Sequence, residues 1–411
     1  MFRRGMGEGA RAAATVWGAD EGRDPRLDGL RGLAIALVLL YHTTQYGFAE
    51  SPFARVLVAL PAVGWSGVDL FFVLSGFLIT GLLLRAKDGA RYYGPFYARR
   101  ALRILPLYWT ALVFFLVLMP RLPGLDRIDA WYPGAAREGW WFWLFLSNVQ
   151  LALEGARQHR FLDIAWSLAI EEHFYLAWPW IVRWTSDRTL LRVCAGAAGL
   201  ALALRVALVW AGAPALAPYV LTPCRLDALA TGAALAVAAR RGGLARLAPA
   251  ARRLLPAAAA AFAACCAWAR LAAGSGQDAA GALAFHAHPL VQTVGYTILC
   301  LLWGSLLVVV ATAPAGGLAA RVFESAGLRR LGLHAYALYL FHFFVASLAA
   351  GLPFVPSRQP GAFVPAQLAL WVVAIGASLL VARGAWVAIE RPALALKRHF
   401  PMAGRGAAPA P

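Results

Sequence analysis

Residues 27–42 read LDGLRGLAIALVLLYH, an apolar run with one arginine near its start and one histidine at its end. Continued to residue 47, the run is long enough to cross the hydrocarbon core of a bilayer, which takes about 17–25 residues. At 100° per residue, Arg31 and His42 share one helix face and lie about 16 Å apart along its axis. An ionisable side chain at bilayer depth costs about 2.5–3.5 kcal/mol. We therefore expect a membrane-spanning helix that turns both side chains toward one channel, with Arg31 at the inner mouth.

The composition extends this interpretation to the whole chain. Of its 411 residues, 61% are hydrophobic and 14% are charged, whereas a soluble domain is about 45–50% apolar and about 25% charged. Lipid accepts such an apolar excess, but a soluble surface does not. We predict an all-α polytopic membrane protein with about ten transmembrane helices. Their expected ranges are 30–47, 66–84, 104–119, 167–184, 190–210, 226–239, 254–271, 291–311, 331–350 and 366–389.

Residues 139–150 are a further apolar segment, too short to span and rich in Trp and Phe, which we interpret as an interfacial or re-entrant helix. With ten spans and the N-terminus inside, most of the 38 Lys and Arg residues fall in inner loops, as the positive-inside rule requires. We expect a cytoplasmic, disordered tail over residues 1–25, a membrane domain over 26–392 and a cytoplasmic tail over 393–411.

The basic charge has a simple explanation in this setting. A formal net charge of +18 could indicate nucleic-acid binding, but loops that set membrane orientation explain it better. We therefore expect the lipid bilayer as a partner and no nucleic acid. The 5 cysteines lack metal-ligand spacing, and we predict no metal site.

Ionisable residues from three predicted helices converge at the outer side of the membrane. Asp69 falls in the first turn of the second span, and Glu171, Glu172 and His173 fall in the outer half of the fourth. A carboxylate near His42 could orient its imidazole and stabilise the charged form, as acid–base catalysis requires. The alternative is a set of interfacial residues held by water and headgroups.

Arginines gather at the opposite, cytoplasmic level. Arg99, Arg100 and Arg103 precede the third span, where they either reflect positive-inside bias or form an anion site, since Arg suits phosphates.

Two further pairs of polar residues each have two possible roles. Arg225 and Asp227 could form a structural pair, with each other or a neighbouring loop, or take part in catalysis. His342, with Tyr336 on the same span, could line a channel or bridge two helices by a hydrogen bond.

Six blocks in order resemble membrane acyltransferase family 3, the bacterial group that includes O-antigen, Nod-factor and macrolide O-acyltransferases. They are residues 27–42, GVDLFFVLSGFLIT at 67–80, FYARRALRILPLYW at 96–109, WSLAIEEHFYLAWP at 166–179, RLDALATG at 225–232 and LGLHAYALYLFH at 331–342. The chain departs from the family pattern at His173, where Gln is usual, and at His334, where Ser is usual. Both departures add a titratable group.

The resemblance implies acyl-coenzyme A (acyl-CoA), usually acetyl-CoA, as a co-substrate, with no permanently bound cofactor. It also implies a stand-alone form without an extracytoplasmic hydrolase-like domain. The expected location is the bacterial cytoplasmic (inner) membrane. We hypothesise an O-acyltransferase that moves the acyl group from cytoplasmic acyl-CoA to a hydroxyl of a carbohydrate or glycosylated acceptor at the outer face. The alternative is a transporter or flippase, which would move its substrate without consuming a thioester.

The hypothesis assigns site residues to three groups. The expected catalytic residues are His42, Asp69, Glu171 and Glu172. The expected donor-binding residues are Arg31, Arg99, Arg100, Arg103, Tyr336 and His342. The expected acceptor-binding residues are Trp166, Ser167, His173, Arg225 and Asp227.

Overall fold

The computed structural model describes residues 24–46, 51–121, 138–155, 161–272, 288–358 and 360–402. The predicted N-terminal tail therefore lies almost wholly outside the described residues, as does the end of the predicted C-terminal tail. Throughout the described ranges the regular structure is helical and there is no strand, so the prediction of an all-α protein is confirmed.

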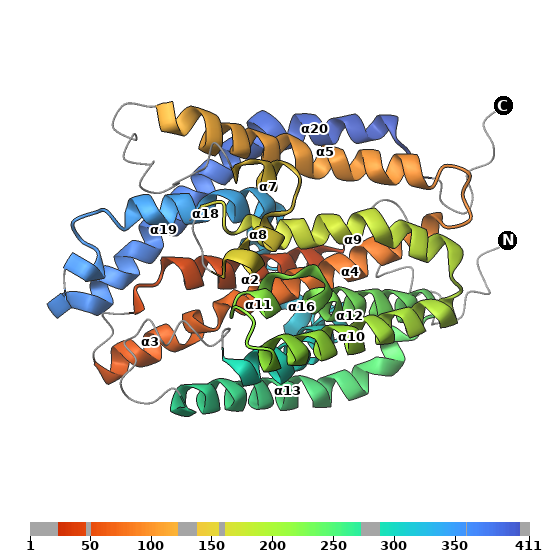
Figure 1. Cartoon of the computed structure of the whole chain (residues 1–411), viewed down its shortest axis with the longest axis horizontal. Helices are drawn as coiled ribbons and strands as arrows, with labels where there is room; N and C mark the ends of the chain where they lie inside the picture. Colours follow the sequence, from red (N-terminus) through yellow and green to blue (C-terminus); the bar gives the residue numbers. More distant parts are fainter. Residues whose placement is uncertain are drawn as a thin grey trace.

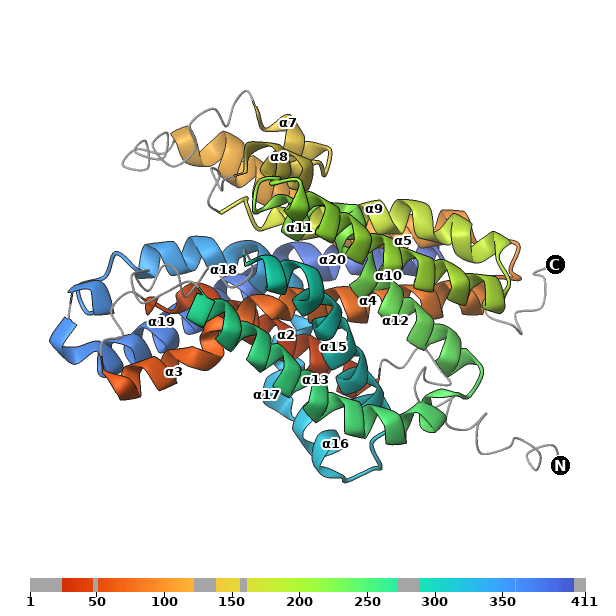
Figure 2. The same ribbon diagram turned by 60° about the horizontal axis from the view of Figure 1, so that its bottom comes forward.

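The long helices run side by side in one bundle (Figure 1). They are α2 (Pro25–Thr43), α4 (Gly67–Ala86), α5 (Tyr93–Leu112), α9 (Ala165–Trp184), α10 (Asp187–Trp210), α12 (Thr222–Arg240), α13 (Leu244–Ala272), α15 (Tyr296–Ala311), α18 (Ala335–Ala349) and α19 (Phe363–Ala385). In Figure 1, α5 and α13 lie along opposite edges and α2 and α4 lie between them; Figure 2 shows α13 and α15 crossing the others at an angle.

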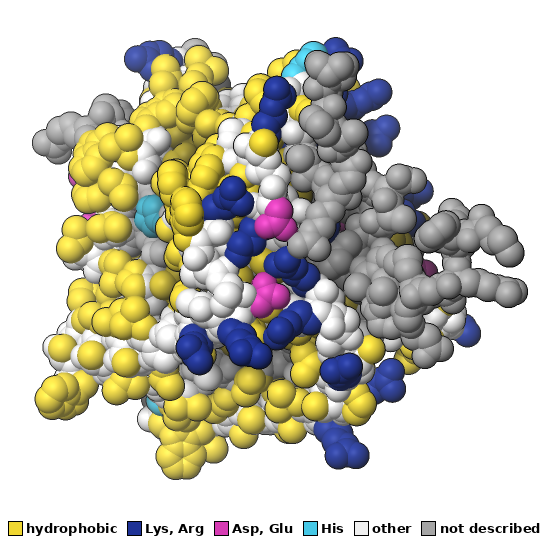
Figure 3. Space-filling view, turned by 90° about the vertical axis from the view of Figure 1, so that its right-hand side faces the viewer, with side chains coloured by type: hydrophobic (Ala, Val, Ile, Leu, Met, Phe, Trp, Pro, Cys, Tyr) yellow, Lys and Arg dark blue, Asp and Glu magenta, His cyan; other side chains and the backbone are white. Residues whose placement is uncertain are grey.

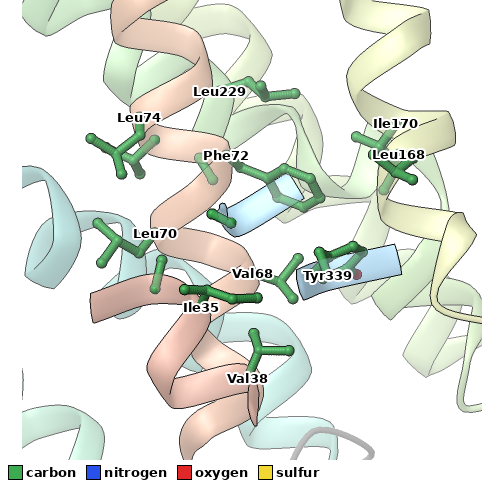
Figure 4. Close-up of a cluster of buried hydrophobic side chains, with 14 of the residues drawn as sticks. Ile35, Val38, Val68, Leu70, Phe72, Leu74, Leu168, Ile170, Leu229 and Tyr339 are labelled. Atoms are coloured by element: carbon green, nitrogen blue, oxygen red, sulfur yellow. The ribbon is translucent and has the colours of Figure 1, made fainter. Parts of the chain in front are cut away.

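A buried apolar cluster fills the space between α2, α4, α9, α12 and α18 (Figure 4). Ile35 and Val38 of α2 face Val68 and Phe72 of α4, and Tyr339 of α18 closes the cluster from another side. These side chains fix the position of α2 in the bundle.

Within the described residues, 7 helical stretches are long and apolar enough to cross a membrane, or up to 8 if one bent pair counts as a span. The predicted count of about ten is not confirmed. Helices α2 and α9 are outside this set, and they contain Arg31, Glu171 and Glu172, whose charges lower their mean hydropathy.

The ninth predicted span is not one helix. Residues 331–350 divide between α17 (Ala326–Leu333) and α18, which meet at an angle of 80° at His334. Gly332 allows α17 to pass directly against α2. A Cβ on this residue would lie 1.9 Å from the Asp28 carbonyl oxygen of α2, so a larger side chain would clash. The apolar run continues through the bend, so hydropathy alone gave no sign of it.

Other boundaries also differ from the sequence-based ranges. The segment at 139–150 forms α7 (Trp140–Trp143) and α8 (Ser147–Glu154), neither long enough to span, separated at Phe145 by a positive φ of 55°. The last helix passes Pro392, through a π turn at Trp386–Glu390 and α20 (Arg391–Ala395), so the chain is still helical beyond residue 393. Proline is tolerated there because it occupies the first turn of α20.

Two glycines allow α4 and α12 to cross closely. A Cβ on Gly76 would lie 2.0 Å from the Leu229 carbonyl oxygen, and one on Gly232 would lie 1.9 Å from that of Val73. Helices in lipid gain little from hydrophobic contact with one another, so close backbone approach at small residues is a main source of their packing energy.

We predict that Gly76→Ala and Gly232→Ala each lower the melting temperature of the detergent-purified protein by several degrees, because overpacking costs about 1–3 kcal/mol. The matched control is Gly196→Ala in α10, where nothing lies within 4 Å of the added Cβ. Since Ala favours a helix over Gly, the control should be unchanged or slightly more stable. Equal melting temperatures for all three variants would contradict the close crossing.

Candidate active site

A cavity of about 140 Å³ lies among α2, α4, α5, α9, α17 and α18. Arg31, Arg100 and Arg103 line it together with Glu171 and Tyr336. The cavity therefore brings together charged side chains from helices far apart in the sequence, in a place otherwise lined by apolar residues such as Phe71, Leu74 and Leu78.

The three cavity arginines are held by different partners. Arg31 pairs with Asp28 at 3.0 Å, Arg103 lies 3.5 Å from Glu390, and the guanidinium of Arg100 lies 5.6 Å from the ring centroid of Tyr175. Arg99 does not line the cavity. Its guanidinium lies 3.4 Å from the carbonyl oxygens of Lys397 and Phe400 near the end of the chain. The sequence grouped Arg99 with Arg100, but neighbouring helical residues point about 100° apart.

The acid in the cavity lining is Glu171 of α9, which is linked to Ser75 of α4 through Tyr175. The Tyr175 hydroxyl donates to Glu171 Oε2 at 2.8 Å and lies 2.5 Å from Ser75 Oγ. Of the two adjacent acids predicted to be catalytic, Glu171 lines the cavity and Glu172 does not.

Two tyrosines of α18 line the cavity one turn apart. Tyr336 donates to the Ile104 carbonyl oxygen at 2.8 Å, which joins α18 to α5. The Tyr339 hydroxyl lies 2.6 Å from Ser167 Oγ and 3.1 Å from the Ile164 carbonyl oxygen, which joins α18 to the start of α9. Ser167, predicted to bind the acceptor, is therefore buried at a helix contact.

One turn beyond Tyr339, His342 meets His42. The distance from His342 Nε2 to His42 Nδ1 is 3.1 Å, His342 is fully buried and His42 is half-buried. Of the two alternatives for His342, the structure therefore contains the hydrogen bond that bridges helices. Sequence reasoning placed the two histidines in separate groups, His42 near the end of α2 and His342 in the middle of α18.

The carboxylate expected beside His42 is engaged elsewhere. Asp69 forms an ion pair with Arg225, whose guanidinium also lies 4.1 Å from the ring centroid of Tyr296. Asp227 pairs with Arg205 at 2.7 Å. Arg225 and Asp227 thus pair with residues of other helices and not with each other. Two buried ion pairs therefore join α12 to α4 and α10.

The remaining predicted acceptor residues lie apart from one another. Trp166 packs against Tyr219, with ring centroids 4.6 Å apart, and is buried. His173 is half-buried and its Nδ1 lies 2.7 Å from Thr222 Oγ1. His334, the other departure from the family pattern, lies at the bend and packs edge-on against Trp386. The structure does not gather the predicted acceptor residues on one surface.

Comparison with known proteins agrees with these features. A family model described as "Acyltransferase domain" matches residues 24–383. The chain belongs to this acyltransferase family. The predicted family and enzyme class are thereby confirmed, and α2, α4, α9, α12 and α18 all lie within the matched region.

Two relatives give the comparison more detail. The peptidoglycan O-acetyltransferase OatA of Listeria monocytogenes serovar 1/2a is 26% identical over 381 residues, which is 90% of this chain and 55% of that protein. The O-acetyltransferase OatA of Staphylococcus aureus strain NCTC 8325 is 32% identical over 179 residues, 40% of this chain and 25% of that protein. The chain thus spans about half or less of each relative's length. No solved structure matches.

We predict that breaking the Asp69–Arg225 pair from one side destabilises the protein strongly. Both side chains are at most 1% exposed, and a charge left alone in such a place costs about 3–5 kcal/mol. Asp69→Leu and Arg225→Met should each lower the melting temperature more than the double variant does.

The exposed pair between Arg240 and Asp187 serves as the control, with side chains 31% and 23% exposed. Arg240→Gln should change stability by about 1 kcal/mol or less. If the double variant were less stable than both single variants, the two side chains would not be acting as a pair.

Proposed function

We propose that this protein is a membrane O-acetyltransferase that takes an acyl group, acetyl in the simplest case, from cytoplasmic acyl-CoA. The acceptor is a hydroxyl of a glycan or glycosylated molecule at the outer face. The observation that carries the proposal is a cavity with three arginines and a histidine pair one helical turn beyond its tyrosine lining. The O-acetyltransferase names of the relatives support the acetyl group.

The arginines suit the nucleotide end of the donor. Arg31, Arg100 and Arg103 are forked cations, which bind phosphate oxygens in a bidentate manner. In the proposal they hold the donor phosphates, while the narrow arm of the donor extends between α4 and α18 toward Tyr339. The apolar lining suits the pantetheine and acyl portion.

The charge distribution supports a cytoplasmic site for the donor. Figure 3 shows Lys and Arg side chains gathered on one end of the molecule, with few acidic side chains among them. This is the end where α4 and α9 finish and α5 and α10 begin (Figure 1). Positive loops favour the cytoplasmic side, so we propose that this end faces the cytoplasm in the inner membrane and that His42 lies toward the outer side.

The proposed reaction needs one proton acceptor and no redox partner. His42 takes the proton from the acceptor hydroxyl, and the oxygen attacks the thioester carbonyl carbon. The carbon–sulfur bond then breaks, and the sulfur leaves with the proton that the His42 imidazolium returns. The products are an O-acyl ester and free CoA thiol, so atoms and charge balance.

We predict that purified protein in detergent or liposomes releases free thiol from acetyl-CoA when an oligosaccharide acceptor is present. His42→Ala should lower this rate by about 10²–10⁴-fold, the usual contribution of a general base. Substrate movement across liposomes without thiol release would indicate a transporter and contradict the proposal.

Adjacent arginines test the donor site. Arg100→Ala should raise KM for acetyl-CoA, because Arg100 lines the cavity, whereas Arg99→Ala should leave KM unchanged, because Arg99 contacts the Lys397 and Phe400 carbonyls. Both variants remove the same charge from α5, so the comparison cancels any general effect of charge. Equal KM values would place the donor outside this cavity.

A further inference from the structure

The ring contacts of the two histidines determine where their protons lie. A backbone carbonyl oxygen only accepts hydrogen bonds, so a histidine nitrogen beside one carries a proton. His342 Nδ1 lies 2.8 Å from the Tyr339 carbonyl oxygen and 3.1 Å from that of Leu338. The neutral His342 ring is therefore protonated on Nδ1, and its Nε2 is an acceptor.

The same reasoning applies to His42. Its Nδ1 lies 3.1 Å from the Val38 carbonyl oxygen and 3.1 Å from His342 Nε2. Both neighbours accept, so the proton of His42 lies on Nδ1 and the lone pair on Nε2. In the opposite arrangement, with His342 donating from Nε2, each Nδ1 lone pair would face a carbonyl oxygen, which is repulsive.

We propose that His342 is a positioning residue that holds His42 in the tautomer with its proton on Nδ1 and its basic lone pair on Nε2. This inference rests on the proposed function and deepens it. It gives His342 the role that a carboxylate has in many acid–base sites, where a buried group accepts from the other ring nitrogen of the catalytic histidine. Asp69, the acid first expected there, is engaged with Arg225.

A neutral partner suits the depth of this site. An extra carboxylate in a helix bundle within lipid would need its own counter-charge. His342 Nε2 instead offers a neutral acceptor, and the bond from His42 Nδ1 strengthens when His42 becomes an imidazolium during transfer. The buried backbone carbonyls of Tyr339 and Leu338 supply the dipoles behind it.

The neighbouring contacts keep His342 in place. Tyr339, three residues earlier on α18, is bound through its hydroxyl to Ser167 and to the Ile164 carbonyl of α9. The rings of Tyr41, His342 and Phe343 surround the His42 ring, with centroids 4.9, 4.9 and 5.1 Å away. The His42 ring is therefore held by these ring contacts and by hydrogen bonding at Nδ1.

The experiment compares three variants on α18 by steady-state thiol release. His342→Leu removes the acceptor and should lower kcat by about 10–100-fold, as loss of the groups that orient metal-bound histidines does. KM for acetyl-CoA should not change. His342→Gln retains an acceptor oxygen and should recover part of kcat. Ser347→Ala is the control, because its hydroxyl donates within its own helix, to the Phe343 carbonyl.

A second measurement is independent of turnover and of variant stability. Nitrogen NMR of the ¹⁵N-histidine-labelled wild-type protein in liposomes, with His42 assigned by its loss in His42→Ala, should show Nδ1 protonated and Nε2 unprotonated.

The outcomes separate this inference from the proposed function. An Nε2-protonated His42 in the wild-type protein would overturn the inference, as would a folded His342→Leu variant with unchanged kcat. If instead the wild-type protein released no thiol, the proposed function would fail, and the NMR result would still decide the tautomer.

Discussion

The ion pair between Asp69 and Arg225 is the interaction on which the arrangement of helices depends. Both side chains are buried in a bundle whose surroundings are lipid, where an unpaired charge is costly. The pair fixes α4 against α12, and the neighbouring pair between Arg205 and Asp227 fixes α10 against α12. Gly76 and Gly232 let the backbones of α4 and α12 come close together beside this pair. Helix α2 then packs on α4, and α17 and α18 pack on α2.

This arrangement explains why the proposed site contains a histidine pair and not a histidine–carboxylate pair. The acids near the centre are already engaged, Asp69 and Asp227 with arginines and Glu171 with Tyr175. Gly332 of α17 packs against Asp28 near the start of α2, and His342 of α18 bonds to His42 near its end. The 80° bend at His334 lies between these two contacts.

The sequence predicted some of these features and not others, for identifiable physical reasons. Apolar runs and charge patterns predicted an all-helical membrane protein, and the spacing of Arg31 and His42 correctly gave one helix that carries both. The ends of α5 and α19 were missed because arginines and proline interrupt the apolar pattern without ending the helix. The partner of Asp69 was missed because the sequence matched this acid to His42 by its depth in the membrane. Those of Arg225 and Asp227 were missed because the sequence offered only each other or a neighbouring loop, whereas each residue pairs with another helix. The pairing of His42 with His342 had only a weak signal, since no periodicity connects residues 300 positions apart.

In the proposed mechanism the acyl end of the donor reaches His42 through the arginine-lined cavity. Photo-crosslinking can follow this path, with an acyl-CoA analogue that carries a diazirine at the end of its acyl chain and mass-spectrometric mapping of the labelled peptides. Labels are expected on the peptides around residues 42 and 342, and acetyl-CoA should compete them away. Competed labels confined to the loops at the arginine-rich end would show that the acyl group never reaches the histidine pair, and would rule out this mechanism.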